Sequence, residues 1–380
     1  MQLTRPLRAA TLALAAGLVA CASASADVLS DEPTARSLFR YFTDSDQVSV
    51  RSLMGDYAML VRGNSSFSVH FNNERVRIPA ISAPVGSQAA VDAITTASRP
   101  ISGNAFQDFV KVRNEFQGAV SNGGRALEYY LSSESDYLGQ QLTARYDRDF
   151  QDQVLNVAVA GSYGWDDIKP LADSDTNTGD RSKTTAHWNV IATRVLGPST
   201  VLRGGVEYNI VHGLQHNPYR NVYAGGTNVA ERHPGARQRR DLFLKLHQYL
   251  NNRSSFKVNY RLYGDDWGIL SHEIGTDVSQ YITQGVIVRY DYRYYTQTSA
   301  DFYLPEYPTV LGIDGYLTGD YRMGPLTSHL FGVALNLDLA HLAPESAWLR
   351  RMGVWVNYER YFNHNNYSAN ILETALDFRF

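Results

Sequence analysis

Hydrophobic and polar residues alternate with a period of two along much of the chain after residue 27. In the segment 372–380 the even positions are mainly Leu and Phe, whereas the odd positions carry charged residues or Ala. The segments 256–263, 286–295 and 331–339 alternate in the same way. Successive side chains of a strand point to opposite faces, so this pattern is typical of strands with one apolar and one polar face. No stretch shows a convincing helical period, and the sequence therefore predicts an all-β fold.

Two all-β architectures produce such alternation, namely a soluble sandwich and a membrane-spanning barrel. The predicted strands are about 10–14 residues long, whereas sandwich strands average roughly six. The chain ends in Phe380 on the apolar face, with Phe378 two residues earlier, which resembles the signal by which Gram-negative barrels are recognised for assembly. Aromatic residues also gather at predicted strand ends, as interfacial girdles require: Trp165, Tyr249, Tyr281, Trp348, Tyr361 and Phe362. We therefore predict a single antiparallel transmembrane β-barrel.

The alternating segments predict about sixteen strands, although counts of 14 or 18 also fit the pattern. The predicted strands are 36–43, 48–61, 66–78, 109–121, 125–134, 137–149, 154–165, 183–196, 200–212, 237–250, 254–264, 269–282, 286–297, 327–340, 351–362 and 369–380. An even count places both termini on the periplasmic side.

The connections between these strands are of two kinds. Short turns rich in Gly, Asn and Pro are assigned to the periplasm, and long polar loops to the cell exterior. The predicted long loops are 79–108, 166–182, 213–236 and 298–326. Residues 89–94 predict an external helix, and 341–350, around Pro344, predict a short periplasmic helix.

The first 26 residues have the pattern of a secretory signal peptide. Arg5 and Arg8 form a charged start, residues 9–20 are apolar, and 24–26 read Ala-Ser-Ala. The apolar run is too short for a transmembrane helix. The sequence thus predicts a signal peptide over 1–26 and a barrel over 27–380.

Cys21 leaves a second interpretation open. Leu18 to Cys21 resemble a bacterial lipobox, in which Cys21 would be lipidated; otherwise the only Cys leaves with the signal peptide. The chain has 35 Lys and Arg against 38 Asp and Glu, a formal net charge of −3. It lacks the basic excess of nucleic-acid-binding proteins, so no nucleic-acid partner is expected.

Four segments support a family resemblance. They are 289–303 (RYDYRYYTQTSADFY), 263–268 (YGDDWG), 231–237 (ERHPGAR) and 134–137 (ESDY). Together they resemble a large family of proteobacterial outer-membrane barrels that is catalogued as a domain of unknown function. The resemblance implies an outer-membrane barrel and supplies no catalytic residues. It also implies a redox or metal-handling context, because members of that family are often encoded beside a small lipoprotein, a thioredoxin-like protein and a flavin transferase.

The polar faces of the predicted strands carry charges of both signs. Basic candidates for the lumen are Lys245, His247, Lys257, Arg261, Arg289 and Arg293, and acidic candidates are Asp338, Glu359, Glu373 and Asp377. Facing basic and acidic walls would create a transverse field that filters polar solutes. The alternative is a plugged lumen in which these charges pair with one another. A barrel of about sixteen strands is wide enough for water.

Two further groups could bind metal ions. His212, His216 and His233 fall in or beside one loop, and a metal site would need them to converge. Surface histidines are the alternative interpretation. Asp265 and Asp266, before Trp267, form either a cation-binding loop or a turn with an aromatic anchor.

An enzymatic barrel is not expected. Ser271, His272 and Glu273 are adjacent on a strand, so they point to opposite faces and cannot form a triad. No Gly-x-Ser-x-Gly motif occurs either.

The sequence therefore predicts a bacterial outer-membrane barrel that acts as a porin-like channel for small polar solutes or ions. The alternative is a non-conducting barrel that serves as a binding or scaffold component of an envelope redox or metal-handling assembly. Expected partners are outer-membrane lipids, the barrel-assembly machinery and, for the alternative, a lipoprotein or redox partner. No cofactor is expected.

Overall fold

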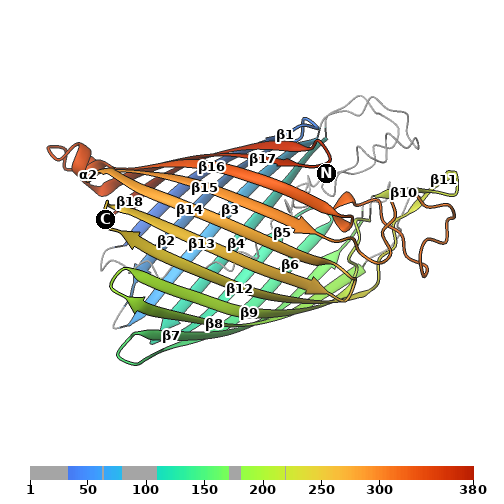
Figure 1. Ribbon diagram of the computed structural model, residues 1–380, viewed down its shortest axis with the longest axis horizontal. Helices are drawn as coiled ribbons and strands as arrows, with labels where there is room; N and C mark the ends of the chain where they lie inside the picture. Colours follow the sequence, from blue (N-terminus) through green and yellow to red (C-terminus); the bar gives the residue numbers. More distant parts are fainter. Residues whose placement is uncertain (1–32, 62–63, 79–108, 171–180, 219) are drawn as a thin grey trace, which may run out of the picture.

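The computed structural model describes residues 33–61, 64–78, 109–170, 181–218 and 220–380. The predicted signal peptide with Cys21, the predicted helix at 89–94 and the loop 79–108 lie outside the described residues, as does most of the loop 166–182. The described chain forms a cylinder of slanted strands with irregular loops at one end (Figure 1). Among the described residues, no helix has the length and hydrophobicity needed to cross a membrane.

Long strands make up the wall, as the alternation predicts. They are β1 (Thr34–Asp44), β2 (Ser49–Leu60), β3 (Ser65–Ile78), β4 (Phe109–Asn122), β5 (Arg125–Ser133), β6 (Tyr137–Phe150), β7 (Leu155–Ile168), β8 (Arg181–Gly197), β9 (Thr200–Gly213), β12 (Ala236–Leu250), β13 (Ser254–Asp265), β14 (Leu270–Thr283), β15 (Val286–Gln297), β16 (Leu326–Asp338), β17 (Met352–Asn363) and β18 (Ser368–Arg379). Two short strands, β10 (Asn221–Ala224) and β11 (Thr227–Ala230), form a separate hairpin in a loop.

The sixteen long strands close into one antiparallel barrel, in which β1 pairs with both β2 and β18. The first and last strands are joined along their whole length, from Thr34 opposite Arg379 to Asp44 opposite Ala369. Closure satisfies the backbone hydrogen bonds of strands that would otherwise be edges. The predicted barrel and its strand number are confirmed.

The strand register separates an outward and an inward face. Leu53, Phe71, Tyr290 and Leu372 lie on the outward face, and each remains at least 42% exposed. A soluble protein rarely exposes so many large apolar side chains, whereas a barrel in a membrane solvates them with lipid. The apolar face of the alternation therefore faces outward.

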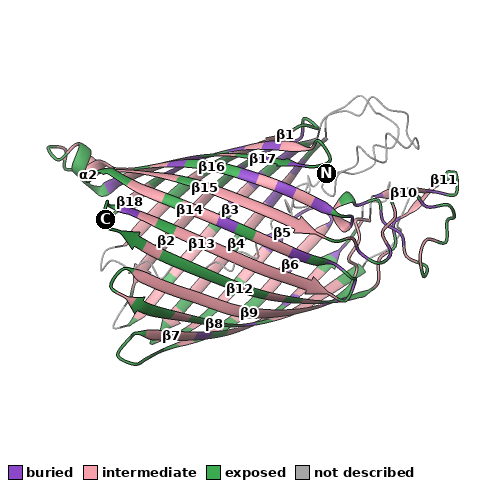
Figure 2. Cartoon of the chain, in the orientation of Figure 1, coloured by how far each residue is buried: buried purple, intermediate pink, exposed green. Residues whose placement is uncertain are grey.

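Part of the inward face is also apolar near the loop-bearing end. Phe42, Val50, Val76, Tyr361 and Ile371 pack together there across the neighbouring strands β1, β2, β3, β17 and β18. Figure 2 shows buried segments on the loop-bearing half of β16, beside this cluster. The predicted place of Tyr361 in an outward aromatic girdle is thus wrong, because period-two alternation assigns two faces without saying which one meets the lipid.

The other predicted girdle residues divide between the two faces. Trp165 stacks on the exposed Tyr163 with ring centroids 6.1 Å apart, and Phe362 is also exposed on the outward face. Tyr249, at the end of β12, lies on the inward face with His247. Tyr281, at the end of β14, lies on the inward face with Asp277. Trp348 is exposed in the connection between β16 and β17.

The two ends of the barrel differ in their connections. The end that holds the start of β1 and the end of β18 has short turns, and the opposite end carries the loops 213–236 and 298–326. In bacterial barrels short turns are periplasmic and long loops are external, so we call these the inner and outer ends. The one longer inner connection contains the helix α2 (Leu339–Leu342) and the 3-10 helix η2 (Leu349–Arg351). A short helix is thus present, although it begins before the predicted 341–350.

Candidate functional site

The inward face of the barrel is the first candidate site. The register places all ten predicted lumen residues on this face, opposite the exposed apolar positions. His247 lies opposite Lys257, Arg289 opposite Ala334, and Glu373 opposite Asn357. The remaining predicted residues lie on the same face of their strands: Lys245, Arg261, Arg293, Asp338, Glu359 and Asp377.

The predicted basic sector contains its own carboxylates. Arg261 Nε lies 2.6 Å from Asp241 Oδ1, and Arg293 Nη1 lies 3.9 Å from Glu273 Oε2. Arg289 Nε lies 3.8 Å from Asp291 Oδ1. Each of these pairs joins residues of the same or adjacent strands, so the charges are compensated along the wall.

The predicted acidic sector is compensated in the same way. Arg40 Nε lies 2.5 Å from Glu373 Oε1, and Arg36 Nε lies 3.5 Å from Asp377 Oδ1. Asn357 also donates hydrogen bonds of 3.1 Å to the carboxylates of Glu373 and Glu359. Asp338 caps α2 by accepting from Ala340 N at 3.0 Å. The lumen wall is therefore a mosaic of ion pairs and not two facing walls of opposite sign.

A basic patch remains at the inner half of β9, β12 and β13. Lys245 lies opposite Arg203 in the register, and His247 lies opposite Lys257, whose other neighbour in the register is Asp277 of β14. The carboxylate of Asp241 on these strands pairs with Arg261, further toward the outer end. We call Arg203, Lys245, His247 and Lys257 the lumenal basic patch.

A buried charged cluster on β3 and β4 was not predicted from the sequence. Arg113 lies between Glu74 and Glu115, with nitrogen–oxygen distances of 3.3 and 3.4 Å. Lys111 Nζ lies 3.9 Å from Asp136 Oδ2. The alternation of Lys111, Arg113 and Glu115 along one strand face was the signal that could have revealed this cluster.

Beside this cluster, Glu134 lies in the tight turn between β5 and β6. Burial raises the pKa of the Glu134 carboxyl to about 8, although Lys111 and Arg113 act in the opposite direction. The surroundings of this turn thus favour the protonated form of the carboxyl.

The outer loops form the second candidate site. Val222, Ala224, Tyr307 and Leu317 make a small apolar core between the β10–β11 hairpin and the segment 298–325. Isolated β-bridges join Ala224 to Tyr307 and Arg232 to Leu317. We call this unit, made by 213–235 and 298–325, the loop assembly.

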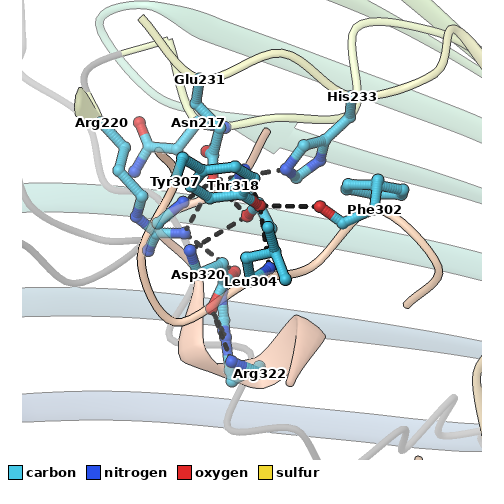
Figure 3. Close-up of polar contacts among 11 residues, drawn as sticks. Asn217, Arg220, Glu231, His233, Phe302, Leu304, Tyr307, Thr318, Asp320 and Arg322 are labelled. Atoms are coloured by element: carbon cyan, nitrogen blue, oxygen red, sulfur yellow. Dashed lines mark hydrogen bonds and ion pairs between the residues drawn. The ribbon is translucent and has the colours of Figure 1, made fainter. Parts of the chain in front are cut away.

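A buried polar network holds the loop assembly together. The Asp320 carboxylate lies between Arg220, 2.9 Å from Nη1, and Arg322, 2.8 Å from Nε (Figure 3). Glu231, which is 1% exposed, accepts hydrogen bonds from Thr318 Oγ1 at 2.6 Å and Gly319 N at 3.0 Å.

These contacts settle the charge states of the two acids. Burial opposes ionisation of Asp320, but Arg220 and Arg322 outweigh it and hold the pKa of Asp320 far below its usual value. Burial likewise opposes ionisation of Glu231, and Arg220 with His233 keeps its pKa lowered. Both carboxylates are therefore charged at neutral pH.

The three predicted metal ligands do not converge. His216 and His233 meet edge to face with ring centroids 5.8 Å apart, and His233 Nε2 lies 3.3 Å from Glu231 Oε1. His212 is exposed on β9 and lies on the opposite face from the buried Val211. Within the described chain, no group of three His, Cys, Asp or Glu side chains is arranged to hold a metal ion.

His216 is neutral at physiological pH. Burial, together with the nearby His233, lowers its pKa to about 4 against a smaller opposing effect of Glu231. His216 and His233 line an open pocket of about 650 Å³ at the outer rim, whose other lining residues include Asp167, Arg181 and Leu214.

The Asp265–Trp267 loop is a turn with an aromatic anchor. Asp265 Oδ1 accepts from the backbone N–H groups of Trp267 and Ile269, each at 3.0 Å. Arg237 lies over the Trp267 ring at 4.2 Å and pairs with Asp265. Gly268 has φ of 90° and its backbone approaches Asp301, so a side chain there would collide with the carboxylate.

The residues considered for an enzymatic triad are separated. Ser271 and Glu273 share the inward face with Tyr263 and Arg261, whereas His272 lies on the outward face. His272 Nδ1 is 2.8 Å from the Tyr260 hydroxyl, which occupies the same outward surface.

The DUF3570 family matches residues 5–350. The chain belongs to this family. DUF3570 is described as a protein of unknown function, so membership supplies no substrate or catalytic residue. Among curated proteins, none matches the sequence significantly.

Solved structures resemble this DUF3570 chain in fold. A bacterial polysaccharide outer membrane secretin matches with a TM-score of 0.51 and 8% identity, over 92% of this chain and 99% of that one. The loop L8 deletion mutant of OmpT, an outer membrane protein of Vibrio cholerae, has a TM-score of 0.47 and 7% identity, over 92% and 98%. OccK1 (OpdK) of Pseudomonas aeruginosa has a TM-score of 0.44 and 11% identity, over 93% and 99%.

These likenesses agree with the barrel architecture and carry no further functional argument. A closed sixteen-strand barrel with an apolar exterior is the architecture of bacterial outer-membrane proteins. The DUF3570 chain is therefore an outer-membrane β-barrel.

Proposed function

We propose that this protein is a water-filled, porin-like channel for small polar solutes or ions. The observation that carries the proposal is the inward face of a sixteen-strand barrel, on which charged residues pair along the wall. Such pairs satisfy the lumen charges without a plug. Barrels of 16 to 18 strands are wide enough to leave an aqueous channel.

The lumenal basic patch supports a contribution to ion selectivity. Arg203, Lys245 and Lys257 bring like charges together on one side of the inner half. A cluster of one sign raises the local concentration of counter-ions, so this patch favours the passage of anions. Ion selectivity needs only the fixed charge of these side chains and no catalytic group. We therefore propose no enzymatic activity.

The test is the single-channel conductance of the refolded mature chain in a planar bilayer. We expect discrete, reproducible current steps from protein whose folding is shown by its heat-modifiable migration on a denaturing gel. Current steps that vanish when the protein is unfolded before reconstitution would support the channel. Silence from folded protein would refute it.

A non-conducting scaffold is the second candidate, and the loop assembly is the observation that favours it. The apolar core and buried ion pairs of the loop assembly fix the arrangement of its external surface. A fixed surface of this kind is suited to bind a partner protein. A lipoprotein or redox protein of the envelope would then co-purify with the barrel. Recovery of such a partner by wild-type protein, but not by a variant without residues 221–230, would support this candidate.

A further inference from the structure

Three basic side chains of the lumenal basic patch lie close enough together to act on one anion. Arg203 on β9 lies directly opposite Lys245 on β12, and Lys257 on β13 lies diagonally beyond Lys245, two residues nearer the inner end. The three strands are neighbours in the wall (Figure 1). Opposite residues of a sheet have Cβ atoms roughly 5 Å apart, and diagonal neighbours roughly 7–8 Å apart. The long Arg and Lys side chains therefore reach a common region on the lumen side of the wall.

Carboxylates neutralise this group only in part. In the described chain, Asp277 is the one carboxylate directly opposite a member of the patch, where it faces Lys257. The carboxylates nearest in the register also have other basic partners: Asp277 with Arg289 at 4.0 Å, Asp241 with Arg261 at 2.6 Å, and Glu207 with His187 at 3.6 Å. Three basic side chains beside one shared carboxylate leave two positive charges in excess. Like charges directly opposite each other on a sheet are destabilising, so an anion between Arg203 and Lys245 stabilises this arrangement.

An aromatic ring separates the patch from the ion pairs nearer the outer end. Phe243 stands between Lys245 and Asp241 along the inward face of β12. Its ring lies against Gly205, where a Cβ would be 2.7 Å from Phe243 Cε1, and Lys245 Nζ lies 5.7 Å from the ring centre. The ammonium group of Lys245 is thus placed beside an apolar surface and not beside the Asp241 carboxylate.

Arg203 carries a donor that the protein does not use. Its Nε is buried and has no hydrogen-bond partner among the described residues. A buried donor without an acceptor costs free energy, which a bound acceptor recovers. Guanidinium groups bind oxyanions through two parallel N–H groups, so an oxyanion is the acceptor whose shape fits Arg203.

We propose that Arg203, Lys245 and Lys257 bind a phosphate group, either free or carried by a small organic solute, inside the lumen. This inference rests on the water-filled lumen proposed above, and it names the class of solute that the lumen wall retains. A phosphate group carries about 1.5 to 2 negative charges at neutral pH, which matches the excess charge of the patch. The guanidinium group binds it through paired hydrogen bonds, and the two ammonium groups act as point charges. A monovalent anion such as acetate leaves part of the positive charge unbalanced.

The experiment measures phosphate binding to the full mature barrel folded in a non-ionic detergent. Inorganic phosphate is titrated by calorimetry at low salt and about pH 8, where it is mostly a dianion. We expect phosphate to bind at least about tenfold more tightly than acetate or chloride, with an affinity that falls as the salt concentration rises. Glycerol 3-phosphate, titrated in parallel, distinguishes a site that accepts phosphate esters from one restricted to the free ion.

Two variants test the assignment to these residues. Arg203→Lys keeps the charge but loses the paired hydrogen bonds, and we expect phosphate to bind about tenfold more weakly. The triple variant Arg203→Gln, Lys245→Gln, Lys257→Gln removes all three charges and is expected to lose phosphate binding by at least about 100-fold.

A matched control removes the same charge from the outside of the barrel. Arg125, Arg148 and Arg194 are exposed on the outward face near the inner ends of β5, β6 and β8. Replacing all three by Gln changes the net charge as the triple lumen variant does, and this control should bind phosphate as tightly as wild type.

Two outcomes would overturn the proposal. They are acetate that binds wild-type protein as tightly as phosphate, and a triple lumen variant that binds phosphate as well as wild type. Should the triple variant fail to fold, the wild-type comparison of phosphate with acetate and the Arg203→Lys variant still decide.

Conductance measured on the same preparation separates this inference from the channel on which it rests. A barrel that conducts but binds no phosphate overturns the phosphate site alone. A folded barrel that neither conducts nor binds phosphate overturns both.

Discussion

At the scale of single residues, the lumen wall is organised by ion pairs between neighbours. Arg261 with Asp241 and Arg40 with Glu373 show that charges of one sign are placed beside partners of the other. Lys245 instead lies opposite Arg203, and Lys257 lies between His247 and Asp277 in the register. Unbalanced charge is what acts on a passing ion, so the lumenal basic patch is where selectivity should be sensitive to substitution.

Replacing Lys245 and Lys257 by Gln should shift the channel toward cations. Each charge removed from the wall of a water-filled pore should change the anion-to-cation permeability ratio about two- to threefold, and less at high salt. The measurement is the reversal potential in a salt gradient. The control Arg148→Gln with Arg194→Gln removes two outward-facing charges, and an equal shift in that control would contradict the assignment.

Asp320 should be the most sensitive residue of the loop assembly. Asp320→Asn leaves Arg220 and Arg322 buried around a neutral amide, a change that typically costs about 3–5 kcal/mol. Hydrogen exchange of the backbone amides at 220–232 and 304–320 should become faster. Asp314→Asn makes the same chemical change at an exposed position of the same loop and should leave exchange unaltered. Similar exchange in both variants would remove Asp320 from this role.

At the scale of elements, the loop assembly is a small folded unit carried by the barrel. Its core joins Val222 and Ala224 of the β10–β11 hairpin to Tyr307 and Leu317, which come much later in the chain. Within the later segment, Tyr307 donates to Phe302 O at 2.7 Å. The long polar loops at 213–236 and 298–326 were predicted from the sequence, but not their association. Neither segment has a periodic apolar face, so no pattern showed that four apolar residues would meet.

The stability of the loop assembly should fall as the pH is lowered from about 6.5 to about 4. His216 has a folded pKa of about 4 against an ordinary value of 6.5, so in this range the unfolded loop binds the proton and the folded loop does not. The stability is full above pH 6.5 and decreases toward pH 4. Glu231 and Asp320 have lowered pKa values. The stability that their ionised carboxylates contribute is therefore lost only when the pH falls below the ordinary carboxyl pKa values near 4.

Protease sensitivity of the outer loops across this pH range provides the measurement. His216→Gln should remove the pH dependence between 6.5 and 4.5, while His212→Gln, at an exposed position, should preserve it. A pH profile that is identical in wild type and His216→Gln would show that another group is responsible.

At the scale of the whole molecule, closure joins the first and last strands of the barrel. The β1–β18 seam extends to Phe380, whose N–H donates to Pro33 O at 3.1 Å, and the Phe380 ring is 58% exposed. The terminal aromatic thus contributes little packing to the finished barrel. The role of Phe378 and Phe380 as a signal for the assembly machinery stays a prediction.

Phe380→Ala should therefore reduce assembly in cells more than stability. We expect the amount of heat-modifiable barrel in outer membranes to fall several-fold, while the purified protein refolds in detergent with a free energy of unfolding within about 1 kcal/mol of wild type. Leu376→Ala, at another exposed position of β18, should leave cellular assembly near normal. Equal losses in both variants would contradict a specific signal.

The sequence by itself determined the barrel and indicated about sixteen strands, with 14 or 18 left open. Period two is a property of each strand alone, so segments such as 286–297 and 369–380 could be located without knowledge of their neighbours. The same local pattern assigned Lys257, Arg289 and Glu373 to one face. Local alternation also explains why the short inner turns and the even number of strands could be predicted.

Only the tertiary structure decided which side chains meet. Arg40 and Glu373 are 333 positions apart and touch because β1 closes on β18, and Glu231 meets Thr318 because two loops fold together. The sequence left open whether the lumen charges form facing walls or pair with one another, and the structure shows lateral pairs. It also separates His212 from His216 and His233. Contacts between distant segments depend on register and closure, which no alternation within one strand encodes.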